Sequence, residues 1–148
     1  LVISAHTLGM FALSPISGRI TARIGMVPAL LAAAGVLALS TAMAAVAPPD
    51  GLLLGVALFL RGYGWNLGLV SGRALLVCGV EHAERTATEG AADTLVWGSS
   101  ALASLSSGLI VASLGFGALG LIGLALVGAA VAAILRLRGQ VSPQPAPS

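Results

Sequence analysis

Long apolar stretches follow one another along this chain, and their length is the feature that most restricts its fold. No charged residue occurs from Met26 to Ala47, and none occurs between Asp93 and Arg136. A helix rises about 1.5 Å per residue and the hydrocarbon core of a bilayer is about 30 Å thick, so one crossing needs about 20 residues. Stretches of this length predict helices that cross a membrane.

The composition leads to the same conclusion. Hydrophobic residues make up 57% of the 148 residues and charged residues only 8%, and the mean hydropathy is +1.03. Soluble proteins carry roughly 25% charged residues, so this chain lacks the polar groups that would cover a folded surface in water. We predict an all-α, polytopic transmembrane bundle. A membrane β-barrel is disfavoured because barrel strands alternate polar and apolar residues over about 10 positions.

Turn signals divide the chain into five predicted spans. Pro48-Pro49-Asp50-Gly51 is the strongest signal, because proline lacks the N–H that a helix needs, and the charged residues 81–89 make a second break. A single helix from Ala92 to Leu135 would be about twice the bilayer thickness, so we place a third break at Gly115-Phe116-Gly117. Residues 139–148, with three prolines, predict a disordered tail. The predicted transmembrane bundle covers residues 1–138, with spans at about 1–17, 26–47, 52–79, 92–114 and 118–135.

The arginines predict the orientation of the bundle. With five spans the turns alternate between the two sides, which places these residues on one side: Arg19, Arg23, Arg85, Arg136 and Arg138. The positive-inside rule makes that side cytoplasmic. Residues 18–25 hold two of these arginines between two glycines and predict a tight polar turn. The C-terminus is therefore expected in the cytoplasm, and the absence of an initiator Met suggests a piece of a longer protein.

The only cysteine, Cys78, lies in an apolar run and is predicted to be buried.

Polar residues are concentrated in three of the five predicted spans. A charge at the bilayer centre costs about 2.5–3.5 kcal/mol, so such residues usually face a partner or a water-filled cavity. The first, third and fourth spans hold the candidates for a substrate path, which are His6, Arg61, Trp65, Asn66, Asp93, Trp97, Ser100 and Ser104. The second and fifth spans hold almost nothing polar. We therefore predict three helices along a path and two helices in lipid.

Three of these candidates fall at similar predicted depth. Arg61 lies about 14–18 Å along its helix from the turn at Pro49, and His6 lies about 18 Å from Gly18. Together with Asn66 they would form a cluster near the midplane, where transporters bind substrates. Structural roles stay open, because His6 could bond a neighbour in the core and Arg61 could pair with an acidic group elsewhere.

The fourth predicted span carries a polar stripe, which the spacings of four, three, four and three place on one helix face. Its members are Asp93, Trp97, Ser100, Ser104 and Ser107. The serines alone would also fit close helix packing with hydrogen bonds across the contact.

Two further patterns concern helix packing and the cytoplasmic end. Glycines at intervals of four in the third span predict a close contact with a neighbouring helix, and they are Gly64, Gly68 and Gly72. Asp93 is expected level with several arginines, where an ion-pair cluster would close the cytoplasmic side or form a static salt bridge. These arginines are Arg19, Arg23 and Arg73.

One loop sequence resembles a family motif. Gly18-Arg19-Ile20-Thr21-Ala22-Arg23-Ile24-Gly25 is similar to the G-x-L-x-D-R-x-G loop of the major facilitator superfamily (MFS), with Ala22 at the Asp position. The stretches Gly64-Trp65-Asn66-Leu67-Gly68 and Ala83-Glu84-Arg85 resemble a bacterial branch. The resemblance covers about residues 1–138 and implies helices eight to twelve of twelve, with eight, ten and eleven along the path. Together with the predicted ion-pair cluster, it gives a cytoplasmic loop motif and gate made of Gly18, Arg19, Arg23, Gly25, Arg73, Glu84 and Arg85.

The resemblance implies a transporter that moves a small solute by alternating access, by secondary active or facilitative transport, in a bacterial inner membrane. The implied partners are the lipid bilayer, a small-molecule substrate and the N-terminal half of the same protein, with no nucleic acid. No cofactor or metal is expected, and proton coupling would have to use His6. The alternative is a membrane scaffold whose polar stripes serve helix packing. An enzyme is not expected, because no HExxH, GxSxG or paired-Asp motif occurs.

Overall fold

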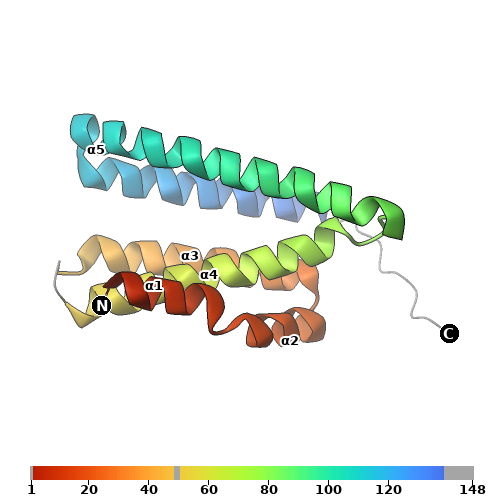
Figure 1. Cartoon of the computed structure of the whole chain (residues 1–148). Coiled ribbons are helices and arrows are strands. Elements are labelled where there is room, and N and C mark those ends of the chain that lie inside the picture. The colour runs from red at the N-terminus through yellow and green to blue at the C-terminus, as the bar shows by residue number, and fades with distance from the viewer. Residues whose placement is uncertain (1, 49–50, 139–148) are drawn as a thin grey trace.

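The computed structural model describes residues 2–48 and 51–138, and it is helical throughout these ranges apart from short turns (Figure 1). The predicted all-α bundle is confirmed. The predicted tail at 139–148 and the turn residues Pro49 and Asp50 lie outside the described residues. The elements are α1 (Val2–Phe11), α2 (Ser14–Ile24), α3 (Met26–Val46), α4 (Leu52–Leu76), a short 3₁₀ turn η1 (His82–Glu84) and α5 (Arg85–Leu137).

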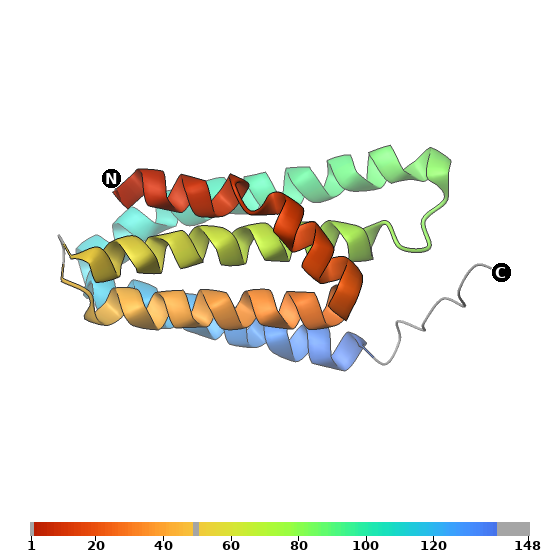
Figure 2. The same cartoon turned by 90° about the horizontal axis from the view of Figure 1, so that it is seen from below.

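Four helical segments are long and apolar enough to cross a bilayer: α3, α4 and the two parts of α5 on either side of a kink. The kink is at Gly115, whose φ of 80° and ψ of 170° are accessible essentially only to glycine. It falls within the break placed at residues 115–117. The two parts of α5 lie side by side in one layer, and α1, α4 and α3 form a second layer (Figures 1 and 2).

The first predicted span is broken rather than continuous. Pro15 has no N–H to donate to the carbonyl of Phe11, and α1 ends there, with its last bond running from Ala12 N to Leu8 O. The chain resumes as α2, in which Ser17 N donates to Leu13 O at 2.9 Å. Neither α1 nor α2 alone is long enough to cross a bilayer.

The predicted tight turn over residues 18–25 is wrong. These residues remain helical to Ile24, and the chain reverses only at Gly25, which has a φ of 90°. Arg, Ile, Thr and Ala are all tolerated in a helix, so a charged stretch at a helix end does not have to be a loop. Cys78 also differs from prediction, because it is exposed just beyond the end of α4.

The described arginines outside α4 gather at one end of the bundle. The end of α2, η1 and the last turn of α5 lie together at that end, while the end of α3, the start of α4 and the bend between the two parts of α5 lie at the other (Figure 1). Arg23 is in the last turn of α2, Arg85 begins α5, and Arg136 is in the last turn of α5. This asymmetry is the one on which the predicted orientation depends.

Glycines set how closely α4 approaches its neighbours. A Cβ added at Gly64 would lie 2.9 Å from Leu37 Cγ and 3.3 Å from Ala33 O, and one at Gly68 would lie 3.6 Å from Ala33 Cβ. The predicted glycine ridge therefore packs against α3. On the other side of α4, a Cβ at Gly62 would overlap the carbonyl oxygen of His6, so the backbones of α1 and α4 touch.

Candidate substrate path

His6 joins α1 to α4. Its Nδ1 lies 3.1 Å from the carbonyl oxygen of Leu58, and because a carbonyl only accepts, Nδ1 carries the proton in this bond. The side chain is half-buried. This is the role of a core histidine bonded to a neighbouring helix, one of the two alternatives that the sequence left open.

Asn66 connects α4 to the break between α1 and α2. Its Nδ2 donates to the carbonyl oxygen of Met10 at 2.6 Å and to Ser14 Oγ at 2.7 Å, and its Oδ1 accepts from Ser17 Oγ at 2.5 Å. Asn66 is 5% exposed and Ser17 is fully buried. The Met10 carbonyl lies next to the proline break, so the Asn66 amide supplies a donor where the helix ladder is interrupted.

The sequence reasoning missed this network. The sequence places Asn66 on the predicted path but does not identify Ser14 and Ser17 as its partners. The signal that could have found them is Pro15, because a proline inside a helix leaves backbone carbonyls without donors.

Arg61 lies in the middle turns of α4 and is exposed. It makes no ion pair and no side-chain hydrogen bond with any residue that the structure describes. His6 and Arg61 are therefore close in depth, since His6 bonds the carbonyl of Leu58, but they differ in their partners. The structure does not bring the predicted midplane cluster together through direct contacts between its members.

Two pairs of side chains connect α4 to the first part of α5. The rings of Trp65 and Trp97 have centroids 6.4 Å apart and are tilted by 58°, a distance typical of interacting aromatic pairs. Nearer the end of α4, Arg73 forms an ion pair and a hydrogen bond with Asp93. The two partners of the ion pair are 44% and 41% exposed, so in water the pair would contribute little to stability.

The rest of the predicted gate does not join this ion pair. Arg19 and Arg23 are exposed, and among the residues described they form no salt bridge. Arg85 donates from Nε to the carbonyl of Val80 at 3.2 Å, and the Glu84 carbonyl accepts from Thr88 Oγ1 at 2.9 Å. The predicted four-residue cluster thus consists of one ion pair here.

The polar stripe of α5 is open on its serine side. Ser100 and Ser104 are exposed, and the Ser100 hydroxyl donates to the carbonyl of Val96 in its own helix at 2.7 Å. Gly108, at the edge of this face, has no neighbouring atom within 4 Å of an added Cβ, and the same holds for Gly98 on the other side of the helix. Within the described part of the chain, therefore, no helix packs closely on this face.

Comparison with known proteins gives the family. The chain is 40% identical over 124 residues, 83% of its length, to the uncharacterised MFS-type transporter YdeG of Bacillus subtilis. It is 37% identical over 113 residues to the uncharacterised MFS-type transporter YddS of the same organism. It is also 32% identical over 114 residues to the riboflavin transporter RfnT of Brucella anthropi. The chain belongs to the major facilitator superfamily.

The superfamily relatives are much longer than this chain. The matched region covers 29% of YdeG, 26% of YddS and 28% of RfnT. No protein-family profile matches the chain, and no solved structure matches it. The helices and their superfamily membership make the chain a multi-pass membrane protein segment.

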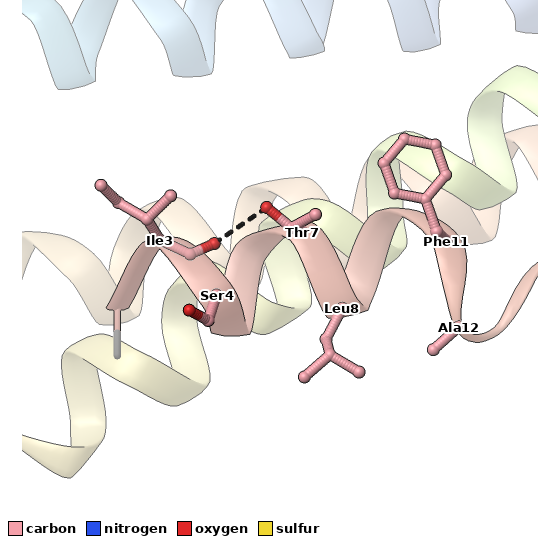
Figure 3. Close-up of a pocket in the computed structure, with 6 residues that line it drawn as sticks. All are labelled: Ile3, Ser4, Thr7, Leu8, Phe11 and Ala12. Atoms are coloured by element: carbon pink, nitrogen blue, oxygen red, sulfur yellow. Dashed lines mark hydrogen bonds between the residues drawn. The ribbon is translucent and has the colours of Figure 1, made fainter.

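In this superfamily segment, two shallow surface depressions are lined by none of the eight candidate path residues. One shallow depression on α1 is lined by Ile3, Ser4, Thr7, Leu8, Phe11 and Ala12 (Figure 3). Its only polar contact drawn is internal to the helix, from Thr7 Oγ1 to Ile3 O at 3.1 Å. Among the residues described, no group of three or more His, Cys, Asp or Glu side chains could hold a metal ion.

Proposed function

We propose that the chain forms part of the C-terminal half of a secondary or facilitative transporter, as helices eight to twelve. In this assignment α1 and α2 together make helix eight, α3 helix nine, α4 helix ten, and the two parts of α5 helices eleven and twelve. A small solute would cross by alternating access, in which two helical bundles rock about a site near the midplane. The N-terminal half of the same protein supplies the other bundle.

The observation that carries this proposal is the exposure of Arg61 in the middle of α4. An arginine facing lipid at that depth would cost about 2.5–3.5 kcal/mol even on the most lenient scale. Trp97, 58% exposed, and the serines of α5 are also uncovered. These polar groups fit a water-filled path. Both parts of α5 expose leucines, such as Leu102 and Leu121, but only the first part also carries polar side chains along its length, and the second part is suited to lipid.

The relatives' names support transport in general. RfnT is named for riboflavin, which favours a small organic solute over an inorganic ion for this chain as well. No cofactor and no enzymatic step are part of the proposal. If transport is coupled to protons, His6 is the candidate, because histidine is the residue type that most readily exchanges a proton near neutral pH and His6 lies at the level of Leu58 in α4.

We also propose that the arginine-rich end of the bundle faces the cytoplasm of a bacterial cell, with the C-terminus on that side. The loop-motif residues at the end of α2 and the Arg73–Asp93 pair would then form the cytoplasmic gate. This gate would be closed when the path is open to the outside.

The test is cysteine accessibility in the intact transporter that contains this chain. Cys78→Ala and replacement of any further cysteines provide the background, and Ser104→Cys and Leu121→Cys are then treated with a charged methanethiosulfonate reagent. Ser104 and Leu121 are both exposed in this structure, but only the former lies on the polar face of α5. We expect reaction at position 104 and none at 121, because the latter is in lipid. Equal lack of reaction at both positions would favour the scaffold alternative.

A further inference from the structure

Arg61 has no anionic partner among the described residues that could neutralise it. Asp93 is occupied by Arg73. The other described acidic residues, which are Glu81, Glu84 and Glu89, lie at or next to η1, at the far end of α4. Arg61 is nine residues after Leu52, or about 14 Å along the helix. A positive charge held at this depth needs an anion from outside this part of the chain.

An aromatic pair lies beside this charge. Trp65 is one helical turn from Arg61, so the two side chains share a face of α4, with Cβ atoms about 5–6 Å apart. Trp65 is half-buried against Trp97, and Trp97 is 58% exposed. Because Trp97 is exposed, its indole has free surface on which a further ring can pack in an offset or edge-to-face geometry.

The register of α4 and α5 places hydroxyl groups at the same level. The two helices run in opposite directions (Figure 1), and the Trp65–Trp97 and Arg73–Asp93 pairs fix which residues face each other. One turn beyond Trp65 is Arg61, and one turn beyond Trp97 is Ser100. Charge, aromatic surface and hydroxyl thus occur within about two turns of two adjacent helices.

We propose that Arg61, Trp65 and Trp97 form a subsite for an organic anion that carries an aromatic ring. The guanidinium binds the carboxylate, sulfonate or phosphate of the solute, and the two indoles bind its ring. The proposal rests on the proposed function, because it assigns a substrate class to the same path. A neutral solute would leave the guanidinium unpaired, and a non-aromatic anion would leave the exposed indole without a stacking partner.

Three probes of similar size separate the contributions of charge and ring. The intact transporter with Ser104→Cys on the cysteine-free background is incubated with 2-naphthoate, 2-naphthamide or decahydro-2-naphthoate, the saturated analogue of the first probe, and the rate of thiol modification is measured. We expect saturable protection by 2-naphthoate at concentrations at least tenfold lower than for 2-naphthamide, the size expected for one charge-assisted hydrogen bond. Relative to the non-aromatic acid we expect concentrations about two- to tenfold lower, the size expected for one aromatic pair. In Arg61→Gln the advantage of 2-naphthoate over 2-naphthamide disappears. In Arg136→Gln, which removes an arginine at the end of α5, the advantage remains.

The outcomes separate this inference from the proposed function. If position 104 reacts with the reagent but 2-naphthoate protects no better than its amide, the path exists and the anion subsite does not. If position 104 does not react at all, the path itself is refuted. The comparison of the three probes needs no substitution at Arg61, so it decides the inference even where Arg61→Gln fails to fold. Undiminished preference for 2-naphthoate in a folded Arg61→Gln would also overturn it.

Discussion

Asn66→Leu tests whether this residue supports the fold or contacts the solute. The substitution keeps a side chain of similar size but removes both amide donors and the acceptor. Three hydrogen bonds are lost, to Met10 O, Ser14 Oγ and Ser17 Oγ. The two serine hydroxyls can bond carbonyls of their own helix instead, but a leucine has no donor for the Met10 carbonyl.

The expected loss of stability follows from these contacts. Interhelical hydrogen bonds in membrane proteins contribute on average about 0.6 kcal/mol each, so three of them amount to about 2 kcal/mol. An acceptor left buried without a donor adds about 1 kcal/mol or more. We therefore expect Asn66→Leu to lower the free energy of unfolding by about 3 kcal/mol. Asn66→Asp should cost more, because a carboxylate oxygen would face the Met10 carbonyl.

The assay is reversible unfolding of the purified intact protein in mixed micelles with increasing dodecyl sulfate. Ser40→Ala is the matched control, because Ser40 is 1% exposed and its hydroxyl has no partner among the residues described. Removing an unpaired hydroxyl should change stability by less than about 0.5 kcal/mol or increase it. A double-mutant cycle between Asn66→Leu and Ser17→Ala should give a coupling of about 1 kcal/mol, since the two side chains share a bond.

The reasoning is refuted if Asn66→Leu unfolds like the wild type. If the same variant also loses transport at normal stability, Asn66 is a path residue, as the sequence alone predicts, and its bonds to the α1–α2 break are incidental to folding.

Three other substitutions test the remaining contacts of the bundle. Gly62→Ala should prevent assembly of α1 on α4, because its Cβ would overlap a backbone oxygen. Gly55→Ala in the same helix meets nothing within 4 Å and should be tolerated. Yields of folded protein from gel filtration compare the two variants, and equal yields would show that the helices can separate at little cost. Gly115→Ala should destabilise the hairpin within α5 by about 1–3 kcal/mol, because a φ of 80° with an extended ψ is strained for alanine, and an unchanged melting temperature would contradict this. Arg73→Asp should impair transport through repulsion of Asp93, and the double exchange with Asp93→Arg should restore it if the pair acts as a gate; failure of the exchange to restore any activity would argue that the pair is not the relevant contact.

Apolar length was sufficient to predict the bundle, because the requirement for about 20 residues per crossing is a property of the bilayer. The same length argument also located the break in α5, where Gly115 was one of three candidate residues. It could not predict the break after α1, since it ignores which carbonyls Pro15 leaves unpaired. It also misjudged residues 18–25, because charge identifies where a chain leaves the hydrocarbon but not where a helix ends.

Within the candidate site, depth could be estimated from the sequence but partners could not. His6, Arg61 and Asn66 lie within about two turns of one another in depth, as counting residues suggested. The structure separates them by face. His6 on α1 bonds the Leu58 carbonyl of α4, and Asn66 on α4 bonds the Met10 carbonyl of α1, so both lie at the α1–α4 contact. Arg61 instead shares its face of α4 with Trp65. Which face of α4 meets α1 depends on the close approach at Gly62, and the spacing of polar residues alone contains no information about that contact.

Whether a polar residue in a membrane helix serves packing or a path can therefore be judged by what remains unsatisfied. Asn66 has three of its hydrogen-bonding capacities used within the fold, so burying it in the bundle is favourable without any solute. Arg61 has none of its five donors used by the described residues. A membrane protein that keeps such a group at mid-depth must satisfy it with water, another helix or a bound anion. Of these three, only a bound anion would make the charge of Arg61 determine which solutes the transporter accepts. Comparing protection by 2-naphthoate and by its amide measures how strongly binding depends on that charge.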